Sequence, residues 1–385
     1  MRSRILRYSA IQCLFWVNFA IVSGNASVYL KSQNLSDTAI GAVIAAAGLG
    51  SAFLSPRMAE WAQRDRERGL HRVSMVLLSV FSASAAAVML LFGRSPAGTA
   101  FAWGICALMM QCMLPLVNSF AVTTGVPFGG PRAAGSVGYA VVIWVFGRIV
   151  PLTGTFILPG SMLIVYLLLM AAILLYPHPD PLPAPAQAEV RQERKGFFLR
   201  RYPELGLLVA GSVGLYLSHM VVNTFAFQIV TAKGGGTEEM GIGSAIAALV
   251  ELPVMMGFAR INRRFSARTL LWVSGVFFTL KSLFTLLSPN LPLYYLTQVL
   301  QMGAFALATV ASVQYIAETI PPEDAVKGQS WYIMATTIGN VIGAQAGGFF
   351  RDQWGVDAML VFATVLSGLG ATIVFAAMHR KAAVQ

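Results

Sequence analysis

The chain has 385 residues, of which 56% are hydrophobic and 11% are charged, and its mean hydropathy is +0.68. A soluble protein of this size needs a largely polar exterior, so this composition excludes a soluble globular protein and favours one surrounded by lipid. The formal net charge of +11 does not indicate a nucleic-acid partner, because the basic residues lie in short runs between apolar segments, as in cytoplasmic loops of membrane proteins.

Apolar runs of about 20 residues are long enough to cross the hydrocarbon of a bilayer as helices. Charged residues, glycine and proline separate twelve such runs, which predict an all-α integral membrane fold with two pseudo-symmetric six-helix bundles. The first run is too long for the core of a signal peptide, so we expect a retained helix. The predicted helices lie near residues 8–30, 37–56, 72–93, 97–121, 129–152, 156–177, 204–230, 238–259, 268–287, 292–317, 328–350 and 356–378.

One long polar interruption divides the helices into six and six. It consists of a Pro-rich stretch, PHPDPLPAPAQ, followed by a basic one, RQERKGFFLRR. We therefore predict an N-terminal bundle at 1–177, a cytoplasmic linker at 178–203 and a C-terminal bundle at 204–385. Lys and Arg are concentrated at the termini and in most segments that follow even-numbered helices, which places both termini in the cytoplasm.

The two halves of the chain resemble each other. The segment IGAVIAAA at 40–47 matches IGSAIAAL at 242–249, and each precedes an apolar stretch and a basic loop. With four loop residues allowed for, Asn25 aligns with Asn223. Internal repeats that hold a substrate between them are typical of secondary transporters.

Ionisable side chains inside predicted membrane helices are few, and each is a functional candidate because it is costly to keep in lipid. Glu251 lies in VELPVMM, and apolar surroundings favour its neutral form, which suits reversible proton uptake. A structural ion pair with Lys281 is the alternative. His219 is either a proton relay or a simple hydrogen-bonding group.

The sequence contains no HExxH, GxSxG or P-loop motif and no metal-ligand cluster. The three cysteines have neither paired nor metal-like spacing. We therefore expect neither an enzyme nor a bound cofactor or metal. A membrane enzyme assembled by the fold and a non-transporting sensor are the remaining alternatives to a transporter.

Two segments resemble a known family. PLVNSF at 115–120 followed by RAAGSVGYA at 132–140 resembles the fourth-to-fifth-helix signature of the phenylpropionate permease and lactose permease branch of the Major Facilitator Superfamily. INRRFSARTLLWVSGVFFTLK at 261–281 resembles the eighth-to-ninth-helix region of the same proteins. The resemblance implies a twelve-helix secondary transporter.

The resemblance also implies roles for individual residues. Asn118, Arg132 and Tyr139 stand where the lactose permease has an acid, an arginine and a ring that hold the sugar. The acid is replaced by an amide, which leaves Arg132 without a carboxylate partner and favours an anionic solute. Gln301 and Ala304 stand where that permease has its proton-coupling His and Glu, and neither residue titrates.

The resemblance also implies which residues take part in proton coupling. Lys281 stands where the lactose permease has an arginine in its ninth helix. The phenylpropionate permease has a Glu in its eighth helix where Glu251 stands, which makes Glu251 the acid placed to carry a coupling proton.

The sequence thus predicts a proton-coupled symporter for a small polar organic solute, such as a sugar, a nucleoside or an organic acid, working by alternating access. An uncoupled facilitator and a proton-driven exporter are alternatives with the same fold. We expect a monomer in a bacterial inner membrane whose partners are the solute, protons and the lipid bilayer. The predicted proton-coupling residues are Glu251, Lys281 and His219, and the predicted substrate contacts are Asn118, Arg132, Tyr139, Asn25, Asn223 and Gln301.

Overall fold

A computed structural model describes residues 2–64, 70–92, 95–124, 126, 129–177 and 198–380, and all regular elements in these ranges are helical. The first half contains α1 (Arg2–Phe19), the π-helix η1 (Ala20–Gly24), α2 (Ala26–Ser32), α3 (Asp37–Arg64), α4 (Leu70–Phe92), α5 (Pro96–Thr124), α6 (Gly129–Thr153) and α7 (Ile157–Leu174). The second half contains α8 (Phe198–Arg201), α9 (Pro203–Thr224), α10 (Ala226–Ala232), α11 (Thr237–Asn262), α12 (Ala267–Leu287), α13 (Leu291–Val299), the 3₁₀-helix η2 (Leu300–Met302), α14 (Phe305–Thr319) and α15 (Pro322–His379).

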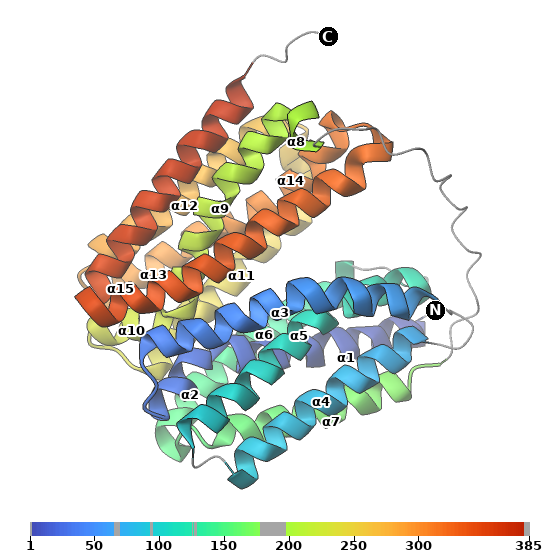
Figure 1. The fold of residues 1–385 in the computed structure, drawn as a ribbon, viewed down its shortest axis with the longest axis vertical. Coiled ribbons are helices and arrows are strands. Elements are labelled where there is room, and N and C mark those ends of the chain that lie inside the picture. Colours follow the sequence, from blue (N-terminus) through green and yellow to red (C-terminus); the bar gives the residue numbers. More distant parts are fainter. Residues whose placement is uncertain are drawn as a thin grey trace.

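Eleven helical segments in the described residues are long and apolar enough to cross a membrane. The last, Lys327–His379, has 53 residues, or about 80 Å of helix, which is more than twice the hydrocarbon thickness. Gly355 interrupts it with φ 86° and ψ −176°, and Figure 1 shows the two halves of α15 running away from a bend. This segment therefore crosses twice, which confirms the predicted twelve crossings.

Several predicted helices are broken within the membrane. The run predicted at 8–30 divides into α1, η1 and α2, and the run at 204–230 breaks at Phe225. At the first break the Asn25 side chain donates to the Ala20 carbonyl at 3.0 Å, which ties it to the π-helical turn.

The structural repeat has a different register from the one expected. Asn34 and Gly234 both adopt positive φ, at 62° and 81°, and they are 200 positions apart (234 − 34). The turns that follow carry equivalent hydrogen bonds, from Leu35 N to Leu30 O and from Gly235 N to Val230 O. With this register Asn25 corresponds to Phe225, so the match with Asn223 is not kept.

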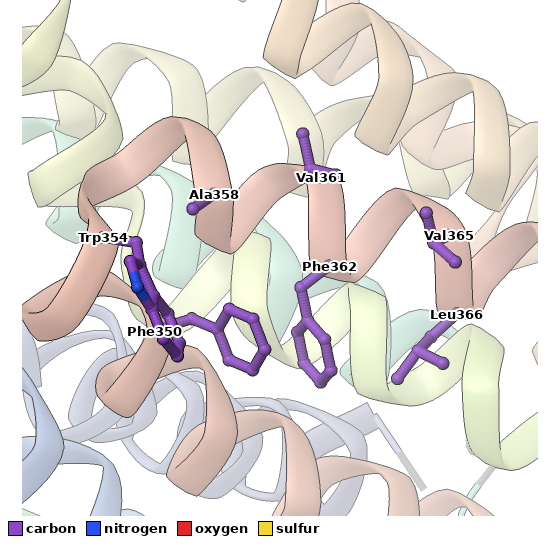
Figure 2. Close-up of a pocket in the computed structure, with 7 residues that line it drawn as sticks. All are labelled: Phe350, Trp354, Ala358, Val361, Phe362, Val365 and Leu366. Atoms are coloured by element: carbon purple, nitrogen blue, oxygen red, sulfur yellow. The ribbon is translucent and has the colours of Figure 1, made fainter.

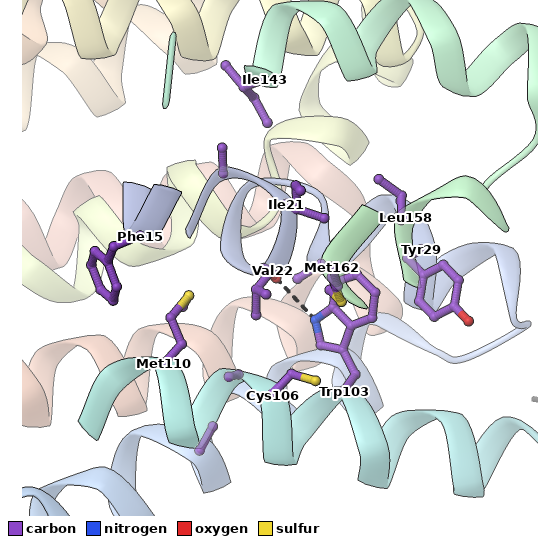
Figure 3. Packing of buried hydrophobic residues seen from close by; sticks show 14 of the residues in the cluster. Phe15, Ile21, Val22, Tyr29, Trp103, Cys106, Met110, Ile143, Leu158 and Met162 are labelled. Carbon is purple, nitrogen blue, oxygen red and sulfur yellow. Dashed lines mark hydrogen bonds between the residues drawn. The ribbon is translucent and has the colours of Figure 1, made fainter. Parts of the chain in front are cut away.

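Aromatic and sulfur-containing side chains fill the core of the N-terminal bundle, as Figure 3 shows. The Trp103 ring is fully buried and stacks on Tyr29 with a centroid distance of 4.6 Å. Its indole Nε1 donates to the Val22 carbonyl at 3.1 Å, within the π-helical turn. The core thus supports the irregular backbone of η1.

The two bundles meet through glycines. Gly41 of α3 lies against the Ala344 backbone of α15, and Gly348 of α15 lies against Asp37, so closely that a side chain at either glycine would collide with backbone. The second interface joins Gly241 of α11 to the α6 backbone at Ile143.

Both interfaces lie at the end of the molecule formed by residues 31–41, 234–241 and 348–355, which we name the closed end. In Figure 1 the bundles approach each other there, near α2 and α10, and diverge towards the N-terminus. Of the predicted linker at 178–203, residues 178–197 lie outside the described residues.

Candidate functional site

A chain of hydrogen bonds links two of the three predicted proton-coupling residues, Lys281 and Glu251, in the C-terminal bundle. Lys281 Nζ on α12 donates to Gln301 Oε1 at 2.6 Å, and Gln301 Nε2 donates to Glu251 Oε1 on α11 at 2.9 Å. Lys281 and Gln301 are 3% and 4% exposed. Gln301 is therefore placed between the predicted proton groups, where it bonds to both charges.

The backbone around Gln301 explains its position. The residue lies in η2, a single 3₁₀ turn that interrupts the crossing formed by α13 and α14. Gly303 follows it and packs directly against the Phe277 ring of α12. Short 3₁₀ stretches inside longer helices often mark functional sites, and this one turns the amide towards α11 and α12.

Arg132 lies on α6 in the N-terminal bundle and lacks a carboxylate at ion-pair distance among the described residues. Its guanidinium carbon lies 3.8 Å from the centroid of the Trp16 ring, and its NH1 donates to Ser136 Oγ at 2.7 Å. Glu251 of the opposite bundle interacts with it electrostatically. Ser136 is its one hydrogen-bond acceptor among the described residues, which leaves most of the guanidinium donors to a solute.

A second network, which sequence reasoning missed, supports Arg132 from α1. Trp16 Nε1 donates to Gln12 Oε1 at 3.2 Å, and Gln12 Nε2 donates to the Tyr8 hydroxyl at 2.7 Å. The same Nε2 lies 3.5 Å from Asn118 Oδ1, which is the limit of a hydrogen bond. The spacing of four residues between Tyr8, Gln12 and Trp16 places them on one helix face and was the available signal.

Tyr139 lies two turns beyond Arg132 on α6. Its ring centroid is 6.3 Å from that of Phe19, and Glu251 interacts with it electrostatically from the other bundle. The structure thus places Arg132 and Tyr139 on the side of the N-terminal bundle that faces Glu251, and among the described residues Asn118 is linked to Arg132 only through Gln12 and Trp16.

The other predicted residues lie in different surroundings. The His219 ring stacks on Phe305 at a centroid distance of 4.7 Å, and Asn223 Nδ2 donates to the His219 carbonyl at 2.8 Å. Lys281 interacts with His219 electrostatically. Asn25 is completely buried at its helix break, so it does not contact a solute in this conformation.

One apolar pocket lies away from these residues, on α15 near its bend, as Figure 2 shows. The side chains of Trp354 and Val365 on its wall are 60% and 55% exposed in a membrane-spanning segment. None of the predicted site residues lines it. The pocket is lined by Phe350, Trp354, Ala358, Val361, Phe362, Val365 and Leu366.

Solved structures share this fold over nearly the whole chain. The nucleoside transporter NupG has a TM-score of 0.79 at 15% identity, covering 98% of this chain and 100% of that one. An auto-inhibited POT family peptide transporter has a TM-score of 0.77 at 13% identity, with 99% and 98% covered. A D-xylose–proton symporter has a TM-score of 0.73 at 17% identity, with 96% of each chain covered.

Comparison with curated protein sequences found no match. The model of the MFS_1 like family matches residues 6–363. With twelve membrane crossings in two bundles and the fold of known transporters, the chain belongs to the MFS_1-like family and is a membrane transporter.

Proposed function

We propose that this transporter carries out proton-coupled symport of a small polar organic solute and that Glu251 carries the proton. The observation that supports this most is the hydrogen-bonded chain of buried Lys281, buried Gln301 and partly buried Glu251 in one bundle, which faces Arg132 in the other. In this proposal the transporter acts as a monomer in a bacterial inner membrane, with both termini in the cytoplasm.

The coupling follows from charge balance between the two bundles. When Glu251 is ionised, its charge compensates Arg132 across the interface and Lys281 through Gln301. Protonation removes that compensation and leaves Arg132 attractive to a negatively charged or strongly polar group on the solute. Solute and proton are then bound together, which is the requirement for symport. The proposed role of His219 is a proton relay, and the electrostatic interaction with Lys281 supports it.

The chemistry around Arg132 defines the solute. A guanidinium with free donors favours a carboxylate, the Asn118 amide bonds to hydroxyl or carbonyl groups, and the Trp16 and Tyr139 rings suit a planar or apolar part. An organic acid fits best. Sugars and nucleosides match the amide and the rings, and structural neighbours at low identity include a nucleoside transporter and a D-xylose–proton symporter.

The test uses purified protein in proteoliposomes. Solute classes are first screened by the thermal stabilisation that they give to the folded protein. Accumulation of the hit is then driven by an inward proton gradient. We expect Glu251→Gln to abolish accumulation but to keep exchange of labelled for unlabelled solute, because exchange does not require net proton movement.

Glu318→Gln is the matched control. Glu318 lies at the end of α14 and accepts from Gln314 Nε2 at 2.8 Å, with no link to Glu251. This variant should accumulate solute like the unaltered protein. If Glu251→Gln also accumulates solute normally, Glu251 does not carry the proton.

An uncoupled facilitator is the second candidate. Gln301 is fixed between Lys281 and Glu251 and cannot titrate, which favours static charge compensation. In the same assay a facilitator would equilibrate solute at all pH gradients without accumulating it. A proton-driven exporter would instead move solute against the direction of proton flow, so an inward proton gradient would drive solute out of the vesicles.

A further inference from the structure

The first turn of α3 is completed by the other bundle. The Asp352 carboxylate on α15 accepts hydrogen bonds from Asp37 N at 3.1 Å, from Thr38 N at 2.6 Å and from the Thr38 hydroxyl at 2.7 Å. The side chain of Ser36, immediately before the helix, accepts from Ala39 N at 3.1 Å and from no other backbone N–H of the described residues. Two of the free backbone donors of the helix N-terminus are therefore satisfied only while the bundles touch.

The side chain of Asp37 makes a second set of contacts across the same interface. Its Oδ1 accepts from Gln228 Nε2 of α10 at 2.6 Å, and its Oδ2 forms an ion pair with Arg351 NH1 of α15 at 2.8 Å. Within its own bundle Oδ2 also pairs with Lys31 Nζ at 2.9 Å. The Asp37 carboxylate is completely buried, whereas the side chains of its partners Lys31 and Arg351 are 34% and 32% exposed, so only the carboxylate end of each contact is shielded from water.

The equivalent interface in the repeat is built differently. The first turn of α11 is capped within its own bundle, because Glu239 Oε2 accepts from Gly236 N at 2.7 Å. Two contacts join it to α6. The Thr237 hydroxyl donates to Gly147 O at 3.0 Å, and Arg148 forms an ion pair with Glu238. The side chains of this ion pair are 53% and 43% exposed. Buried charge crosses between bundles at the α3–α15 interface, whereas the α6–α11 ion pair is open to water.

We propose that Asp37 and Asp352 form a latch that holds the closed end shut and sets the equilibrium between this conformation and one open at that end. Opening separates Asp37 from Gln228 and Arg351, and it uncaps α3. Each acid keeps a cation in its own bundle, since Asp37 retains Lys31 and Asp352 lies 3.8 Å from Arg351. Neither carboxylate is left uncompensated, so the latch can release reversibly.

The latch is tested by measuring the distance between the bundles at the closed end. Spin labels are placed at Gln33, after α2, and at Ala232, at the end of α10, in full-length protein whose native cysteines are replaced. Distance distributions are recorded in lipid nanodiscs without solute or proton gradient, so the result does not depend on the role of Glu251. We expect Asp352→Asn to raise the ratio of open to closed molecules by about tenfold or more, as the loss of a charge-assisted hydrogen bond predicts.

Glu239→Gln is the matched control, because it alters a capping carboxylate that lies within one bundle. It should leave the distance distribution unchanged. Thr38→Val is a milder second variant, which removes only the hydroxyl contact and should shift the ratio in the same direction by a few-fold. The proposal is overturned if folded Asp352→Asn and Thr38→Val keep the original distribution, or if Glu239→Gln shifts it equally.

Discussion

The amide of Gln301 separates the buried charge of Lys281 from the partly buried charge of Glu251, and its removal has a calculable cost. In Gln301→Leu the Lys281 ammonium, 3% exposed, loses its 2.6 Å acceptor, and Glu251 loses its 2.9 Å donor. A hydrogen bond from a neutral group to a charged one contributes about 1.5–3 kcal/mol, and its loss leaves the buried Lys281 charge without compensation. We expect a loss of this size in the free energy of unfolding.

The chain offers a matched control one turn earlier. Gln298 is also buried, but its amide donates only to the neutral Thr297 hydroxyl, at 3.2 Å. Gln298→Leu should therefore cost about 1 kcal/mol, the typical value for a neutral hydrogen bond. Both variants are measured by equilibrium unfolding in the same detergent. In the double variant Gln301→Leu with Lys281→Met, part of the loss should be recovered because the uncompensated charge is gone.

Two results would refute this reasoning. A cost for Gln301→Leu no larger than that for Gln298→Leu would mean that Glu251 and Lys281 rearrange to pair directly. A double variant whose cost equals the sum of the single variants would mean that Gln301 and Lys281 act independently, which their 2.6 Å hydrogen bond contradicts.

Further outcomes concern the site and the closed end. Gln12→Leu removes the acceptor that holds the Trp16 indole, so we expect the solute KM to rise about tenfold with little change in the maximal rate, measured by initial uptake in proteoliposomes. Gly41→Val places a side chain against the Ala344 backbone, so the closed end should stay open in the spin-label experiment, whereas Gly98→Ala, whose nearest neighbour atom would lie 3.6 Å away, should change nothing.

The twelve crossings follow from sequence because a bilayer forces apolar runs of nearly fixed length. The breaks inside those runs were not predictable in the same way. Phe225 and the residues of η2 include no glycine or proline, and their irregular backbone depends on packing against other helices. The register of the repeat is likewise defined by the positive φ angles of Asn34 and Gly234. The sequence similarity had instead aligned Asn25 with Asn223, two residues away from Phe225.

The ionisable residues of the candidate site were predictable, because charged side chains are rare in the apolar segments. Glu251, Lys281 and Arg132 were found because ionisable residues in apolar segments are exceptional. The bridging position of Gln301 was not found, because it depends on contacts 20 and 50 residues away along the chain. Asp37 was missed because an acid at the start of a helix ordinarily faces water, whereas here the second bundle buries it. The solute and the proton stay predictions until transport is measured.

The contacts at the closed end correspond to a pair of short sequence motifs that can be searched for in related sequences. Asp37 and Gly41 are four residues apart on α3, and Gly348 and Asp352 are four residues apart on α15, so in each helix the acid and the glycine share one face. The order is inverted, with Asp-x-x-x-Gly in the second crossing and Gly-x-x-x-Asp in the eleventh. Relatives that keep both motifs should have inherited this closure, and relatives that have lost one acid should have lost the other.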